Sequence, residues 1–123
     1  MRRIVIPGTL ALSILAGVGP ALAANGALAY DENTKKYGLS SNEETQAKAD
    51  DVAMKECGGD KCKIVFRTAS RQCGAITTSE TNGSNAWGGG KSPQKAAAEL
   101  DAVRNCQKRT KGQCKVRSVE CNR

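Results

Sequence analysis

Cysteine is the most chemically versatile residue type in this chain of 123 residues, which has six cysteines and no histidine. An even number of cysteines in a short exported chain is typical of a disulfide framework. Zinc binding is the alternative, but the sequence lacks both histidine and a Cys-x-x-C pair. We therefore expect three disulfides, no metal site and no cofactor. The cysteines are Cys57, Cys62, Cys73, Cys106, Cys114 and Cys121.

Residues suited to catalysis are few. Without histidine, the usual base for a serine or cysteine nucleophile is missing. Gly90-Lys91-Ser92 has the last residues of a phosphate-binding loop, but the required earlier glycine is replaced by Asn85. The acidic pairs Glu43-Glu44 and Asp50-Asp51 are sequence neighbours, which do not share one face of a helix. We expect that the protein is not an enzyme, and we assign no catalytic residue.

Positive charge is concentrated in the C-terminal third of the chain. Residues 24–90 carry a net charge of −1, whereas residues 91–123 carry +6. Such a region can bind an anionic polymer or an envelope or secreted protein, although ordinary solvated surface is the alternative. No aromatic residue interleaves these cations, so we expect no specific readout of nucleic acid. The candidate binding residues are Lys108, Arg109, Lys111, Lys115 and Arg117.

The N-terminal segment has the order of a secretory signal peptide. Arg2 and Arg3 precede an apolar stretch over residues 4–18, and Ala21-Leu-Ala23 supplies a cleavage site. The apolar stretch is shorter than the roughly 20 residues that a membrane span needs. We expect residues 1–23 to be removed, leaving Ala24 as the first residue of a secreted or periplasmic protein without a membrane span. Removal would lower the net charge from +7 to +5.

The rest of the chain is an internal repeat. Residues 47–57 align with residues 96–106 at a spacing of 49, with matching alanines, charges and a final cysteine. This match predicts one duplicated domain over residues 24–123. Unit one would occupy about 24–72 and unit two about 73–123.

Each unit has the pattern of two short strands, a helix and a third strand. The strand pairs are predicted at 26–31 and 36–40, then at 73–78 and 84–88, the second around an Asn-Gly turn. Ser41 with Glu44, and Ser92 with Pro93, have the spacing of helix starts. The glycines 88–90 would then be a flexible approach to the second helix. We predict an α+β fold of duplicated ββαβ units, with two helices packed on antiparallel sheet.

The positions of the cysteines within the two units suggest how they pair. Alternation places Cys62 on one buried strand face with Ile64 and Phe66, and the helix packed on that face ends at Cys57. We therefore predict Cys57–Cys62 and, by the same logic, Cys106–Cys114. The remaining pair, Cys73–Cys121, would bridge the two halves. The same alternation predicts an outward pair, Lys63 and Arg67, equivalent to Lys115 and Arg117.

Several short segments together resemble a known family. They are Gly26–Tyr30, Cys57–Val65, Cys73–Ile76, Trp87–Gly90 and Val119–Asn122, and they resemble the domain of unknown function 4189 family of small exported bacterial proteins. The resemblance implies an α+β fold built from a duplicated unit. It implies no established catalytic activity. We therefore interpret the chain as an exported, non-catalytic binding module; the alternative is a periplasmic inhibitor or immunity-type protein that acts on a secreted enzyme.

Overall fold

Two consecutive ββαβ units make up the folded part of the protein. The structure, a computed structural model, describes residues 23–123, so the predicted signal peptide lies outside the described residues apart from Ala23. This arrangement confirms the predicted α+β class and the duplicated unit. Unit one holds β1 (Asn25–Tyr30), β2 (Tyr37–Glu43), α1 (Gln46–Cys57) and β3 (Lys63–Thr68); unit two holds β4 (Cys73–Ser79), β5 (Trp87–Ser92), α2 (Lys95–Gln107) and β6 (Cys114–Cys121).

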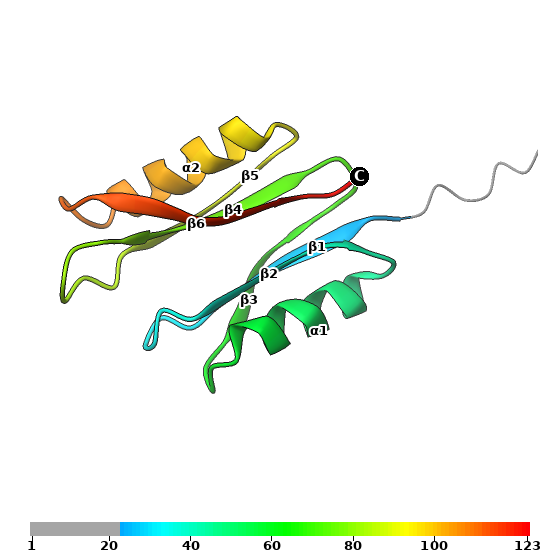
Figure 1. Ribbon diagram of the computed structural model, residues 1–123, viewed down its shortest axis with the longest axis horizontal. Coiled ribbons are helices and arrows are strands. Elements are labelled where there is room, and N and C mark those ends of the chain that lie inside the picture. The colour runs from blue at the N-terminus through cyan, green and yellow to red at the C-terminus, as the bar shows by residue number, and fades with distance from the viewer. Residues whose placement is uncertain (1–22) are drawn as a thin grey trace, which may run out of the picture.

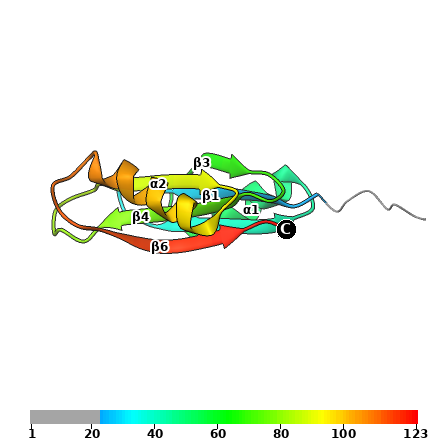
Figure 2. The same ribbon diagram turned by 90° about the horizontal axis from the view of Figure 1, so that it is seen from above.

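Each unit forms its own antiparallel sheet of three strands. The strand orders are β2-β1-β3 and β5-β4-β6, so the first strand of each unit is central and the other two are edges. The two sheets face each other, and α1 and α2 cover their outer faces, which gives four layers (Figures 1 and 2). The edge strands of one sheet lie over those of the other: β2 contacts β6, and β3 contacts β5.

The alternation of residue size along β1 explains the layers. Ala27 and Ala29 point toward α1, where they pack against alanines of the helix. Leu28 and Tyr30 point the other way and pack against Ile76 of the facing sheet. Large side chains therefore fill the space between the sheets, while small ones let each helix lie close to its own sheet.

Glycine at β5 permits this close approach of the second helix. A Cβ atom on Gly88 would overlap the Ala102 carbonyl oxygen, and one on Gly90 would overlap the Ala98 carbonyl oxygen. The Thr77 hydroxyl of β4 also donates to the Ala102 carbonyl, at 2.7 Å and in a buried position. These glycines are therefore part of a strand under a helix, which corrects the prediction of a flexible approach segment.

Both helices begin later than predicted. The N-cap of α1 is Thr45, whose hydroxyl accepts from the Lys48 amide at 3.1 Å, and α2 follows Gln94 without a side-chain cap. Ser41 and Ser92, which were predicted to start the helices, lie in β2 and β5 instead. Pairing with the central strand of each sheet continues as far as these serines or beyond, so the chain stays extended there.

Strand β3 contains an irregularity that changes which residues share a face. The register against β1 shifts so that Phe66 lies opposite Leu28, and Ile64 lies opposite Ala29. A β-bulge adds one residue and so reverses the alternation beyond it. As a result Ile64 packs toward α1, and Phe66 packs between the sheets. The predicted common face of Ile64 and Phe66 is therefore wrong.

The structure contains the three disulfides that the cysteine positions predict, and every cysteine is bonded. Cys57–Cys62 and Cys106–Cys114 each join a helix end to the start of the next strand. Cys73–Cys121 joins β4 to β6, with 3.9 Å between the Cα atoms. Both strands belong to the sheet of unit two, so this bond does not bridge the halves, contrary to the prediction.

A buried asparagine near the C-terminus connects the halves instead. The Asn122 amide nitrogen donates to the Thr68 hydroxyl at 2.8 Å and to the Ala69 carbonyl at 2.9 Å. Its amide oxygen accepts from the Asn42 backbone N–H at 2.8 Å. Asn122 is 7% exposed, so unit two contributes one buried side chain to the margin of the unit-one sheet.

Candidate binding groove

The five predicted binding residues are all exposed, but they do not form one surface. Lys108 and Arg109 follow the end of α2, on the side of β5. Arg117 lies elsewhere: its Nε donates to the Thr78 hydroxyl at 2.7 Å, and it lines a separate hollow with Lys35. Lys115 lies opposite Thr78 in the same strand pairing. The sequence therefore predicted two separate groups as one.

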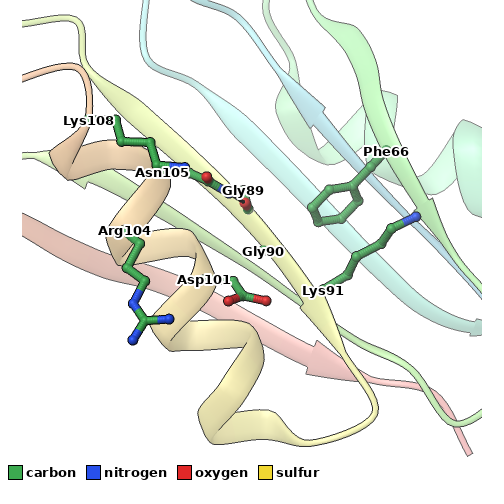
Figure 3. A pocket seen from close by; sticks show the side chains of 8 residues that line it. All are labelled: Phe66, Gly89, Gly90, Lys91, Asp101, Arg104, Asn105 and Lys108. Carbon is green, nitrogen blue, oxygen red and sulfur yellow. Dashed lines mark hydrogen bonds between the residues drawn. The ribbon is translucent and has the colours of Figure 1, made fainter.

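Lys108 belongs to a groove between α2 and the edge of the unit-one sheet. The groove consists of two adjoining hollows of about 490 Å³ and 350 Å³. Figure 3 shows the first hollow, with α2 and β5 on one side and Phe66 on the other. We call this feature the basic groove. Its charged and aromatic residues are Phe66, Trp87, Lys91, Asp101, Arg104, Lys108 and Arg109.

Helical and strand periodicity bring these cations together. Arg104 of α2 and Lys108, the C-cap residue with helical backbone angles, are four residues apart, so they lie on one side of the helix. Trp87, Gly89 and Lys91 alternate along β5 and therefore share one strand face. With Arg109, four cations surround a groove that has one acidic residue, Asp101. The basic groove therefore favours an anionic ligand.

Two aromatic rings form part of the groove, although none is adjacent to the cations in sequence. The Phe66 ring packs on Gly89, where an added Cβ would lie 3.0 Å from a ring carbon. The Arg109 guanidinium lies over the Trp87 ring, 4.7 Å from the ring centroid. Its centroid is also 4.7 Å from that of Tyr30. Because Trp87 already packs against these two groups, it is poorly placed to stack on a nucleic-acid base.

A hydrogen bond and this aromatic stack connect the first hairpin to the groove. The Trp87 indole N–H donates to the Glu32 carboxylate at 3.3 Å. Burial raises the pKa of Tyr30, and the negative charges of Glu32 and Asp31 raise it further. Glu32 therefore holds the indole from the side of the first hairpin while Arg109 covers it from α2. These contacts link Trp87 both to the first hairpin and to the segment that follows α2.

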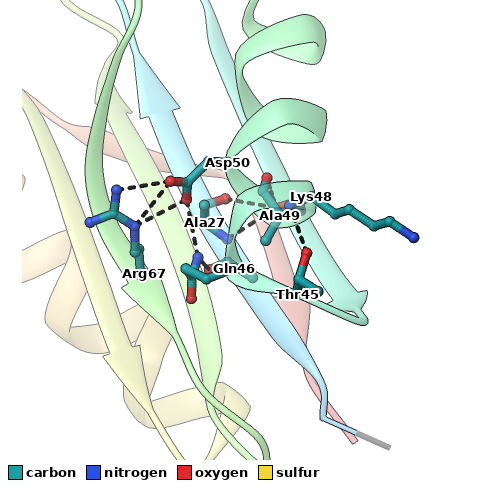
Figure 4. Close-up of polar contacts among 9 residues, drawn as sticks. Ala27, Thr45, Gln46, Lys48, Ala49, Asp50 and Arg67 are labelled. Carbon is teal, nitrogen blue, oxygen red and sulfur yellow. Dashed lines mark hydrogen bonds and ion pairs between the residues drawn. The ribbon is translucent and has the colours of Figure 1, made fainter.

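The second predicted cationic pair does not contribute a free cationic patch. The Arg67 guanidinium binds the Asp50 carboxylate of α1, with Nη2 to Oδ2 at 2.8 Å (Figure 4). Hydrogen bonds from Arg67 lower the pKa of Asp50, burial opposes this, and a hydrogen bond from Gln46 lowers it further. Lys63 lies opposite Tyr30, on the other face of the sheet. The bulge in β3 separates the two cations.

A second polar cluster lies in the turn after β1. Asp31 is 1% exposed, and its carboxylate accepts backbone N–H groups from Asn33, Thr34 and Lys61. Burial favours the neutral acid, but these hydrogen bonds outweigh it and lower the pKa of Asp31. The carboxylate is already satisfied by the chain itself, so we interpret this cluster as support for the turn.

Within residues 23–123, no group of three or more His, Cys, Asp or Glu side chains is placed to hold a metal ion. No helix in the same range has the length and apolar character needed to cross a membrane. Gly90-Lys91-Ser92 lies at the end of β5 rather than in a phosphate-binding loop.

Sequence reasoning missed four of the six cationic and aromatic residues of the groove. Arg104 could have been found, because it precedes Lys108 by one helical turn. Lys91 and Phe66 could not, since their proximity depends on how one sheet lies over the other. Trp87 reaches Arg109 only because α2 lies on β5.

The fold and its disulfides define a class of small proteins built from a duplicated, disulfide-bonded ββαβ unit. The family described as "Domain of unknown function (DUF4189)" matches residues 25–121. The chain therefore belongs to this family, which confirms the resemblance found in its sequence.

Mycobacterial proteins are among its relatives. Protein Rv1269c of Mycobacterium tuberculosis is 37% identical over 78 residues, which is 63% of this chain and 57% of the relative. Uncharacterized protein Rv1813c of the same organism is 37% identical over 93 residues, or 75% of this chain and 60% of the relative. The matched part thus spans less than two thirds of each relative.

One solved structure resembles the whole chain. The NMR structure of Rv1813c from Mycobacterium tuberculosis has a TM-score of 0.60 and 24% sequence identity, and the match covers 99% of this chain and 98% of that one. At this identity the likeness shows a shared fold.

Proposed function

We propose that the protein is an exported, non-catalytic binding module whose basic groove receives an anionic partner. The main observation in support of this proposal is the arrangement of four cations around a groove that contains one acidic side chain. The cations come from β5, α2 and the residues that follow α2, and at one end of the groove Trp87 packs against Arg109 and Tyr30. Side chains that are already packed in the free protein lose little conformational freedom when a partner binds, which favours recognition.

Export is part of this proposal. Three disulfides in a domain of about 100 residues suit an oxidising compartment, because thiols stay reduced in the cytosol. The order of charged, apolar and small residues at the N-terminus supports the same conclusion. We expect the exported form to begin at Ala24. N-terminal sequencing tests this, and retention of residues 1–23 would mean that the segment is an anchor.

A binding test should compare two variants of equal net charge. The groove variant carries Lys91→Gln, Arg104→Gln and Lys108→Gln. The control variant carries the same change at exposed lysines that form no side-chain hydrogen bond or ion pair in the described residues, Lys36, Lys55 and Lys61. Both lower the net charge by three.

The oxidised mature protein and both variants would be tested against acidic proteins and anionic polymers at rising salt. We expect wild type and control to bind in a salt-dependent way and the groove variant to bind at least tenfold more weakly. Equal losses in both variants would mean that net charge, and not the groove, determines binding. Stoichiometric capture of a secreted enzyme together with loss of its activity would support the inhibitor alternative.

A further inference from the structure

The geometry points to an extended acidic peptide as the ligand of the basic groove, bound by adding a strand to the free edge of β3. This inference rests on the proposed function and assigns the class of its partner. The edge of β3 supplies the backbone groups, and the cations of β5 and α2 supply charge. Neither set of residues recognises a peptide alone, but the groove holds them side by side.

Strand β3 has a free edge that faces the groove. It pairs with β1 on one side and is the last strand of its sheet. Figure 2 shows β3 at the margin of the molecule, beyond α2. Val65 of this strand is 38% exposed and lines the groove. A free edge of this kind is where an extended peptide can add as a further strand.

One backbone group of this edge already takes a donor from the groove. The Lys91 ammonium donates to the Arg67 carbonyl oxygen at 3.3 Å. In a strand, the carbonyl and the N–H of one residue point to the same side, so the Arg67 N–H faces the same edge. A peptide N–H could replace the Lys91 ammonium at this carbonyl. Lys91 would then be free to pair with a carboxylate of the same peptide.

The dimensions of the groove suit a short extended segment. Trp87 and Lys91 are four residues apart along β5, which corresponds to about 13 Å. An extended peptide would place about four residues in this length, with side chains of one face about 7 Å apart. Arg104 and Lys108 are separated by about 6 Å along α2. Carboxylates at alternate peptide positions therefore match the spacing of the cations.

Other polyanions fit these features less well. Base stacking needs an available aromatic face, and Trp87 already packs against Arg109 and Tyr30. A sulfated or phosphorylated polymer would use the cations but would leave the β3 edge without partners. The peptide uses both, which is why we favour it.

The experiment uses the oxidised mature protein, labelled with ¹⁵N, and a peptide of four Glu-Val repeats with blocked ends. Two matched peptides carry N-methyl groups on either the valines or the glutamates. N-methylation keeps the charge and side chains but removes the donors that a strand needs. We expect at least one methylated peptide to bind tenfold or more weakly than the unmodified one. We also expect amide exchange at Arg67 to slow at least tenfold when the unmodified peptide binds.

Three contrary results would each lead to a different conclusion. If all three peptides bind equally and exchange at Arg67 is unchanged, strand addition is wrong while the anion-binding function stands. If no peptide binds but polyphosphate binds the wild type and not the groove variant, the ligand class is wrong and the groove remains the site. If neither the peptides nor polyphosphate bind, both proposals fail.

Discussion

Replacement of Asn122 by alanine should strongly destabilise the protein, because this side chain connects the two units. It makes three hydrogen bonds of 2.8 to 2.9 Å to the unit-one sheet and its neighbouring loop. Each such bond contributes roughly 1 kcal/mol to stability. The change also leaves the Thr68 hydroxyl, which is 3% exposed, without its Asn122 donor. We therefore expect a loss of about 3 to 4 kcal/mol.

Urea unfolding of the oxidised mature protein measures this loss, with fluorescence of the single tryptophan as the signal. With a slope of about 1.5 kcal/mol per M, the midpoint should fall by about 2 M. Asn85→Ala is the control, since Asn85 is exposed and its side chain forms no hydrogen bond in residues 23–123. A midpoint for Asn122→Ala within about 0.3 M of the control, which at this slope corresponds to the roughly 0.5 kcal/mol spread of surface substitutions, would refute the reasoning.

Three further changes test the helix–sheet contact, the disulfides and the first turn. Gly88→Ala should lower the free energy of unfolding in urea by about 3 kcal/mol or more, because the added Cβ meets the α2 backbone. The control Gly83→Ala, at a position with φ of 80° and open space around it, should lower it by about 1 kcal/mol, and equal losses would contradict this. Replacing both cysteines of Cys73–Cys121 by serine should lower the free energy of unfolding by about 2 kcal/mol more than the same change at Cys57–Cys62, because the closed loops span 48 and 5 residues. Peptide mapping without reduction checks the pairing itself. The stabilisation from ionised Asp31 should be complete above its ordinary pKa of 3.8 and should be lost as pH falls through its lower folded-state pKa. Asp31→Asn should therefore flatten the dependence of the melting temperature on pH below pH 4. A profile that keeps its wild-type slope would exclude this carboxylate as the cause.

The order of the elements and the cysteine pairs follow from the sequence because the signals are local and occur twice. A helix that ends at a cysteine shortly before a strand brings two cysteines together whatever surrounds them, as at Cys57–Cys62. The left-handed Gly58, with φ of 67°, ends α1 where the sequence predicts. The second copy, in which α2 ends one residue after Cys106, supports the same interpretation. Duplication therefore made the fold class predictable.

The basic groove depended on tertiary structure. One inserted residue in β3 placed Ile64 and Phe66 on opposite faces, and no local pattern marks such a bulge. Gly88–Gly90 has the composition of a flexible segment, yet it forms a strand because α2 needs the missing side chains to approach. Facing sheets then brought Phe66 to Gly89. The sequence determined which local elements form and which disulfides join them. Long-range packing decided which cations and aromatic rings meet, because those contacts join residues that share no local pattern.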